Sequence, residues 1–237
     1  SYQKALAIQP NLADVWNNLG TSFQKLNQYE DAIKSFEKAY SIKPEIDYIL
    51  GNILGAKMNC CNWNGLSELL DDAQKRIVNN EKVIDSYTLT GLIDDPALQR
   101  KTAELFTQYH YPKKKSLTLI DRYPKHPKIR IGYFSADFRE HPVGFLTAEL
   151  YELHDRNHFE IHAFSLDSDS TIDHINLRIK SGVSYFHDMQ SMSHQEIALH
   201  ARSLEIDIAI DLGGFTHESR TDVFAMSAAP IQLSYIG

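Results

Sequence analysis

The chain has 237 residues, and its 43% hydrophobic and 23% charged residues are typical of a globular protein and exclude a disordered or fibrous chain. This length suits one or two domains, and because no run of about 18 apolar residues occurs we expect no membrane partner. The net charge of −7 argues against nucleic acid as a partner, because phosphate binding needs a basic surface.

The first 46 residues contain a repeat. Residues 1–10 and 35–44 share identities at a separation of 34 residues, at Ser1/Ser35, Lys4/Lys38, Ala5/Ala39, Ile8/Ile42 and Pro10/Pro44. This period is that of tetratricopeptide repeats, which are pairs of closely packed helices. Residues 13–46 therefore predict one complete helix-turn-helix unit, and residues 1–10 the second helix of a preceding one. Because a repeat needs neighbours to cover its apolar face, we expect the amino terminus to be truncated.

Residues 47–115 predict a transitional helical segment in which the repeat has decayed. Apolar residues recur at helical spacing between Leu66 and Ile77, and Pro96 suits the first turn of another helix. We place the end of this segment at the lysine run of residues 113–115, because the charge changes there. Residues 116–237 hold 10 Lys and Arg against 17 Asp and Glu.

The remaining residues, 116–237, alternate between strand and helix patterns. We expect strands at 129–134, 159–164, 183–186, 206–210 and 231–235, and helices at 143–153, 194–203 and 220–226. Short links between such elements favour a parallel sheet covered on both faces. The predicted fold is therefore α-helical tetratricopeptide repeats followed by an α/β Rossmann-like lobe.

Candidate functional residues follow the first predicted strand, because ligands of parallel sheets bind at the carboxyl ends of strands. Asp137 and His141 lie there, and Pro142 would place His141 at the start of a helix, where N–H groups face a ligand. The imidazole could then accept a proton or bind a sugar or phosphate oxygen. The alternative is an ordinary solvated loop histidine.

A second candidate follows the predicted strand at 206–210. In the bend at 211–216, Gly213 and Gly214 could let the backbone approach a ligand or adopt a positive φ, and a plain tight turn is the alternative. Neither loop has the Gly-x-Gly-x-x-Gly fingerprint of dinucleotide sites, which disfavours a nicotinamide or flavin enzyme.

Metal and thiol chemistry are not predicted. His154, His158 and His162 are four residues apart, but 159–162 has a strand pattern, so the three cannot share one helical face. The adjacent Cys60 and Cys61 cannot bridge each other without strain. We expect both to be small buried hydrophobes beside Trp63, in a reducing cytoplasmic compartment.

Several motifs follow one another in the order found in a known family. They lie at residues 61–63, 94–100, 131–138, 141–142, 211–216, 220, 224–225 and 229–232. Together with the repeats, they resemble the O-linked N-acetylglucosamine transferases and their SPINDLY relatives, of which this chain looks like a bacterial-type fragment. The resemblance covers nearly the whole chain.

This resemblance implies a two-lobed GT-B glycosyltransferase, with residues 116–237 as its amino-terminal catalytic lobe. It implies transfer of a sugar, N-acetylglucosamine from UDP-GlcNAc, to Ser or Thr hydroxyls of proteins, with inversion and without a metal or other cofactor. Acceptor proteins or peptides are expected along the tetratricopeptide repeats. The nucleotide sugar is expected on a second lobe that this sequence lacks, so we expect the chain alone to be inactive.

The resemblance also assigns roles to single residues. His141 matches the family's active-site histidine, which serves as the base or in positioning. Asp207 occupies a position where animal members carry a histidine, and it is taken with His141 as catalytic. The expected substrate-binding residues are Asp137, Pro142, Asp211, Gly213, Gly214, Thr216 and Arg220. Gly214 and Thr216 match the family's glycine-aromatic-threonine turn, whereas Gly213 replaces a usual polar residue.

Two alternatives stay open at this point. The chain could belong to a tetratricopeptide adaptor whose Rossmann-like lobe only binds, or to a related enzyme that transfers fucose or glucose.

Overall fold

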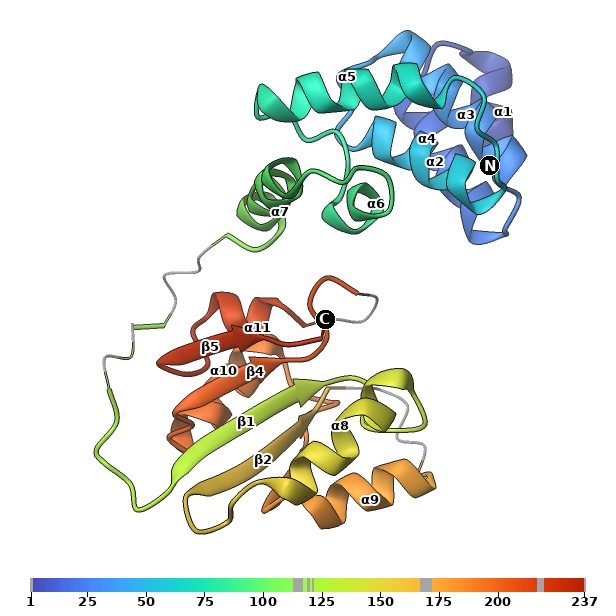
Figure 1. Cartoon of the computed structure of the whole chain (residues 1–237). Helices are drawn as coiled ribbons and strands as arrows, with labels where there is room; N and C mark the ends of the chain where they lie inside the picture. Colours follow the sequence, from blue (N-terminus) through green and yellow to red (C-terminus); the bar gives the residue numbers. More distant parts are fainter. Residues whose placement is uncertain are drawn as a thin grey trace. The chain divides into compact units, whose positions relative to one another are not determined.

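The structure, a computed structural model, describes residues 2–112, 117, 118, 120, 122–166, 172–216 and 220–236. The chain forms two compact units, Ser1–His110 and Tyr111–Gly237, which we describe separately (Figure 1). The predicted boundary in the lysine run, 113–115, lies outside the described residues. Within the described part of the chain, none of the helices combines the length and apolar character needed to span a bilayer.

The first unit is helical. Its helices are α1 (Tyr2–Ile8), α2 (Ala13–Lys25), α3 (Tyr29–Ile42), α4 (Ile49–Asn59), α5 (Leu66–Val78), α6 (Ser86–Thr90) and α7 (Pro96–His110). Helices α2 and α3 form the predicted pair over 13–46. Gly20 of α2 must be small, because a Cβ there would lie 2.6 Å from the ring of Phe36. Pro96 begins α7, as its position predicts.

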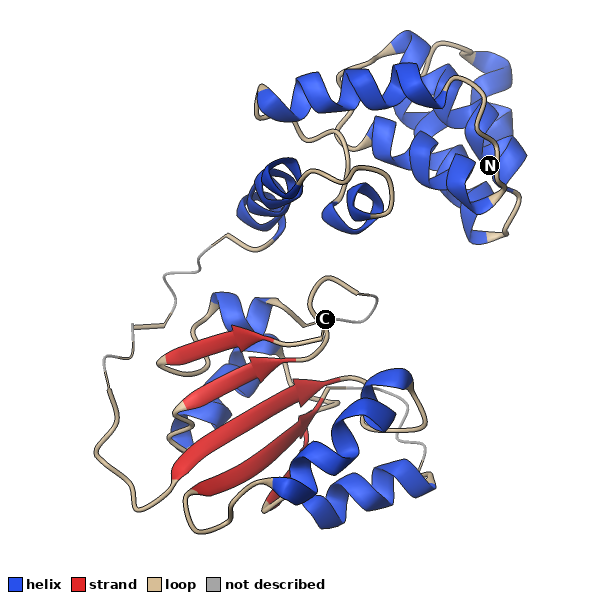
Figure 2. Ribbon diagram, in the orientation of Figure 1, coloured by secondary structure: helices blue, strands red, loops and turns tan. Residues whose placement is uncertain are grey.

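The second unit is a five-stranded parallel sheet with the strand order β3-β2-β1-β4-β5 (Figure 2). The strands are β1 (Ile129–Ser135), β2 (Phe159–Ser165), β3 (Tyr185–Asp188), β4 (Ile208–Asp211) and β5 (Ile231–Ser234). The helices are α8 (Pro142–Leu153), α9 (His174–Gly182), α10 (His194–Ser203) and α11 (Asp222–Ala225). The predicted helical unit followed by an α/β lobe is confirmed.

Helices cover both faces of this sheet (Figure 1). Successive residues of a strand point to opposite faces, so Tyr133 packs with α8 and α9 while Phe134 packs with α10 and α11. Both side chains are buried, at 3% and 0% exposure. This two-sided burial explains why residues 131–134 contain no charged side chain and do not alternate between polar and apolar residues.

Three details differ from the sequence-based expectation. Helix α9 was not expected. Strand β3 begins two residues later than predicted, and β4 begins at Ile208 because the Ile206 N–H still bonds to the Ala201 carbonyl at the end of α10.

Candidate functional site

The carboxyl ends of β1 and β4 lie next to each other, because the two strands pair in parallel with Phe134 opposite Asp211. The loops that follow these strands enclose a small pocket. It is lined by Phe134, Ser135, Ala136, Asp137, Leu166, Asp211, Gly213, Thr216 and Arg220. The structure thus brings together five of the residues proposed from the sequence: Asp137, Asp211, Gly213, Thr216 and Arg220.

His141 lies at the far end of the loop after β1 and caps α8. Its Nδ1 accepts a hydrogen bond from the Val143 N–H at 3.3 Å, and Pro142 takes the first helical position as predicted. Asp137, which lines the pocket, places Oδ2 3.7 Å from the same Nδ1. His141 is therefore beside the pocket, and its side chain is 40% exposed.

This capping bond constrains the chemistry of His141. A ring nitrogen that accepts a hydrogen bond carries no proton, so the neutral imidazole holds its proton on Nε2. In this tautomer His141 can donate a hydrogen bond from Nε2 to a substrate oxygen. The bond pattern thus favours a positioning role over that of a base.

The glycine bend after β4 is built around Asp211. Its Oδ1 accepts the N–H groups of Gly213 at 2.9 Å and Gly214 at 3.2 Å. Gly214 has a φ of +53°, which a side chain would strain. The Thr216 hydroxyl closes the turn by donating to the Gly213 carbonyl at 2.6 Å.

Two charged groups of the pocket have shifted pKa values. Burial raises the pKa of the Asp211 carboxyl, and the N–H groups of Gly213 and Gly214 offset part of this rise. Burial lowers the pKa of the Arg220 guanidinium, which donates to the carbonyls of Met189, at 3.2 Å, and Met192. Asp211 is thereby a better proton acceptor than an exposed carboxylate, and Arg220 joins the pocket to the segment after β3.

Asp207, which the resemblance takes as catalytic, does not line this pocket. Asp207 precedes β4 and Asp211 is its last residue, so the two lie at opposite ends of this strand. The Asp207 carboxylate accepts the Arg130 N–H at 2.9 Å, near the start of β1. Asp207 therefore joins the amino ends of β1 and β4, whereas His141 lies after the carboxyl end of β1.

The three histidines spaced four apart are separated, as the strand pattern predicts. His154 bonds to the Tyr133 hydroxyl at 2.8 Å, His158 to Asp155 at 2.7 Å, and His162 lies in β2. Among the described residues, no three His, Cys, Asp or Glu side chains are grouped as a metal site would require. The cysteine expectation was wrong in part: Cys60 is half-buried and Cys61 exposed, beside a Trp63 that is 57% exposed.

Four lining residues of the pocket were not proposed as site residues: Phe134, Ser135, Ala136 and Leu166. Ser135 is the last residue of β1, and its hydroxyl accepts the Asp137 N–H at 2.9 Å. Leu166 directly follows β2, so the carboxyl-end rule that found Asp137 and Asp211 could also have found it. Its apolar side chain gave no chemical signal.

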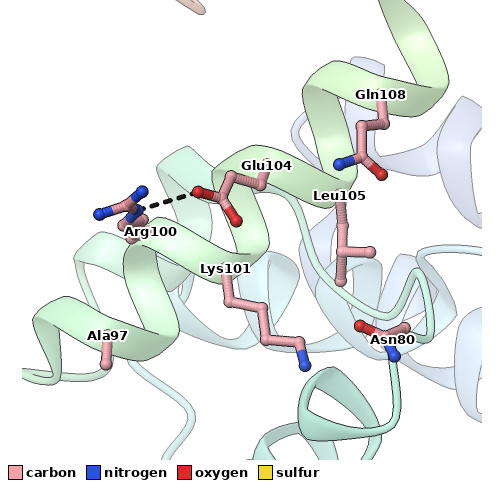
Figure 3. A pocket seen from close by; sticks show the side chains of 7 residues that line it. All are labelled: Asn80, Ala97, Arg100, Lys101, Glu104, Leu105 and Gln108. Carbon is pink, nitrogen blue, oxygen red and sulfur yellow. Dashed lines mark hydrogen bonds and ion pairs between the residues drawn. The ribbon is translucent and has the colours of Figure 1, made fainter.

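The first unit has a pocket of its own, along α7 (Figure 3). Its two basic side chains are already engaged. Arg100 pairs with Glu104 at 2.9 Å, and the Lys101 ammonium donates to the Val78 carbonyl at 2.8 Å. This pocket therefore gives no reason to assign it a charged ligand.

Comparison with known proteins agrees with this architecture. The model of glycosyl transferase family 41 matches residues 98–237, more than half of the chain. The chain belongs to glycosyltransferase family 41. The tetratricopeptide repeat model matches residues 13–46, the α2–α3 pair.

Two relatives named as N-acetylglucosaminyltransferases each match just under half of this chain. A protein of Arabidopsis thaliana named probable UDP-N-acetylglucosamine--peptide N-acetylglucosaminyltransferase SEC is 36% identical over 110 residues, 46% of this chain and 11% of that protein. The UDP-N-acetylglucosamine--peptide N-acetylglucosaminyltransferase of Caenorhabditis elegans is 32% identical over 113 residues, 46% of this chain and 10% of that protein. The chain thus matches about a tenth of the length of these relatives.

A solved structure shares the fold. The O-GlcNAc transferase mutant of Thermobaculum terrenum matches with a TM-score of 0.58 and 23% identity, over 99% of this chain and 46% of that one. The expected family resemblance is confirmed, and so is the fold class, half of a GT-B enzyme preceded by repeats.

Proposed function

We propose that this chain serves in the transfer of N-acetylglucosamine from UDP-GlcNAc to Ser or Thr hydroxyls of proteins. Membership of family 41 and the printed names of the two relatives support this activity. The observation that carries the proposal is the placement of His141 beside a pocket formed by the carboxyl ends of β1 and β4. In sheets of this kind, substrates bind at that edge.

The reaction we propose is a single displacement with inversion and without a metal. The acceptor hydroxyl oxygen attacks the anomeric carbon, the bond to the diphosphate breaks, and the hydroxyl proton passes to a base. His141 would orient an oxygen of the donor or acceptor through its Nε2–H, since its Nδ1 is used by the helix cap. Asp211, with its raised pKa, is the carboxylate of the pocket best suited to take a proton.

The partners follow from the two units. We propose that the tetratricopeptide unit binds extended segments of acceptor proteins in the cytoplasm. In a two-lobed enzyme the nucleotide is held by the other lobe, so we propose that residues 1–237 alone do not catalyse transfer.

The test uses protein expressed from the complete reading frame that contains this sequence, with labelled UDP-GlcNAc and an acceptor peptide. We expect His141→Ala to lower turnover by about 10² to 10⁴-fold, the usual range for such a side chain. His158→Ala is the matched control, because His158 is 75% exposed and bonds to Asp155, outside the pocket. We expect turnover to survive EDTA and the product to carry the inverted anomeric configuration.

Other results would redirect the proposal. Equal turnover of His141→Ala and the wild type would remove His141 from the mechanism. Transfer from GDP-fucose or UDP-glucose, but not from UDP-GlcNAc, would change the donor. Peptide capture in calorimetry without binding of any nucleotide sugar would favour the adaptor.

A further inference from the structure

Helix α9 contacts the loop that carries Asp137 and His141. Three hydrogen bonds join its amino end to this loop. The Asn176 Nδ2 donates to the Phe138 carbonyl at 2.7 Å, the Glu140 N–H donates to Asp173 Oδ2 at 2.6 Å, and His174 Nδ1 bonds to Glu140 Oε1 at 2.5 Å. Each of these bonds reaches a loop residue between Asp137 and His141.

Of the three bonds, the Asn176 contact is the one buried from water. Asn176 is 8% exposed and Phe138 2% exposed, so no water can easily replace their bond. Breaking it would leave a buried carbonyl without a donor, at a cost of about 1 to 3 kcal/mol. The loop is thus anchored in the core at Phe138, the residue directly after Asp137.

The Asp173 carboxylate accepts hydrogen bonds both from the start of α9 and from the loop. Its Oδ1 accepts the Asn176 N–H at 2.7 Å as the helix cap, while its Oδ2 accepts the Glu140 N–H. Partial burial works against ionisation, but the N–H groups of Asn176, Glu140 and Ile175 outweigh it and lower the pKa of Asp173. Asp173 therefore stays ionised at neutral pH, with Oδ1 for the helix cap and Oδ2 for the loop.

Helix α8 confines the loop from its other side. A Cβ on Gly144 would clash with the loop, because it would lie 2.1 Å from the Arg139 carbonyl oxygen and 3.2 Å from the Asp137 carbonyl oxygen. The backbone between Asp137 and His141 is therefore held between the first turns of two helices, α8 and α9.

We propose that the amino end of α9, through Asn176 and Asp173, is a positioning element that holds His141 in its capping geometry and so fixes its proton on Nε2. Neither residue lines the pocket; both act through the loop backbone. The consequence for catalysis rests on the proposed function, whereas the effect on the imidazole does not. A loosened loop would release the cap, and the His141 ring would then exchange between its two tautomers.

Two variants test this inference. Asp173→Asn keeps one oxygen for the helix cap, at which Asn is as favourable as Asp, but has no second oxygen for the Glu140 N–H. Asn176→Asp keeps the size of the side chain and removes the donor to Phe138. Ile179→Val is the control: it weakens the packing of a fully buried residue of α9 that makes none of the three bonds.

The first readout is the imidazole ¹⁵N spectrum of His141 in the 237-residue chain, recorded without substrate. We expect the Nε2–H tautomer in the wild type and in Ile179→Val, and an averaged mixture of tautomers in Asp173→Asn and Asn176→Asp. A His141 spectrum that Asp173→Asn leaves unchanged would overturn the inference, and this variant suffices if Asn176→Asp does not fold.

The second readout is kinetic, on the protein from the complete reading frame. We expect Asp173→Asn to lower kcat about 10-fold with the KM for UDP-GlcNAc nearly unchanged, because a misplaced group costs rate more than binding. A changed spectrum in a protein that shows no transfer even as wild type would support the positioning role while refuting the proposed function. A normal kcat despite a changed spectrum would overturn the catalytic part of the inference.

Discussion

Gly144 shows at the residue scale how the absence of a side chain builds the site. It lies in the first turn of α8, where a helix would ordinarily favour alanine over glycine by about 1 kcal/mol. The glycine is needed because the Arg139 carbonyl occupies the place of a Cβ. The loop that carries Asp137 and His141 therefore packs on α8 at this glycine.

We expect Gly144→Ala to destabilise the second unit by about 3 kcal/mol, the upper range for overpacking, because the obstructing atom is backbone and cannot rotate away. Urea unfolding followed by the histidine signals would measure this. Gly55→Ala in α4 is the control. Its Cβ would have 3.7 Å to the nearest atom, so we expect the first unit to gain up to about 1 kcal/mol. A neutral Gly144→Ala would mean that the loop has room to shift.

At the scale of elements, a row of imidazoles joins β2, β3 and α10. His162 Nδ1 lies 3.0 Å from His187 Nε2, and His187 Nδ1 lies 3.4 Å from His200 Nε2. Glu160, which also pairs with Arg130, bonds to the other nitrogen of His162 at 3.0 Å. Both nitrogens of His187 thus face other imidazoles, and within the described part of the chain no carboxylate is bonded to either of them.

This row predicts a loss of stability in mild acid. Burial, followed by the charges of His162 and His200, lowers the pKa of His187 to about 4, well below its unfolded value of about 6.5. Between these values the unfolded chain binds more protons, so stability falls as the pH falls. From pH 7 to pH 5 we expect His187 to contribute a loss of at most about 2 kcal/mol, reduced by its partial exposure.

Urea unfolding at pH 7 and pH 5 would measure this loss in the wild type and in His187→Gln, which cannot titrate. We expect a smaller difference between the two pH values in the variant, with a remainder from His162, whose pKa burial also lowers. His158→Gln on the surface should behave as the wild type does. The expectation fails if His187→Gln keeps the full pH dependence.

Strands β1 and β4 and helix α9 show which elements sequence patterns can predict and which they cannot. The strand at 129–134 was predictable because its residues from Ile131 onward are buried on both faces. The loops carrying Asp137 and Asp211 were expected to lie together because β1 and β4 are parallel and end on the same side of the sheet. Helix α9 escaped prediction because its buried apolar residues, Ile175 and Ile179, make too short a stripe between polar residues. Its bonds to Phe138 and Glu140 join positions more than 30 residues apart, which no local pattern reveals.

At the scale of the whole molecule, the two units have separate apolar cores. The helical unit buries residues such as Ile53 at 0% exposure, and the α/β unit buries its own set, including Ile161 at 0%. Among the described residues, each of these buried clusters is made of residues from its own unit. We therefore expect each unit to unfold as a cooperative step with its own midpoint.

A reciprocal pair of substitutions tests this expectation. Ile53→Val and Ile161→Val remove the same methylene from fully buried sites, and each should cost its own unit about 0.5 to 1.5 kcal/mol. The sequence supplies separate probes, since both tryptophans, Trp16 and Trp63, report on the first unit while ten of the eleven histidines lie in the second. In urea, Ile53→Val should shift only the tryptophan fluorescence transition and Ile161→Val only the histidine NMR transition. If either substitution moved both transitions by the same amount, the two units would be one cooperative body.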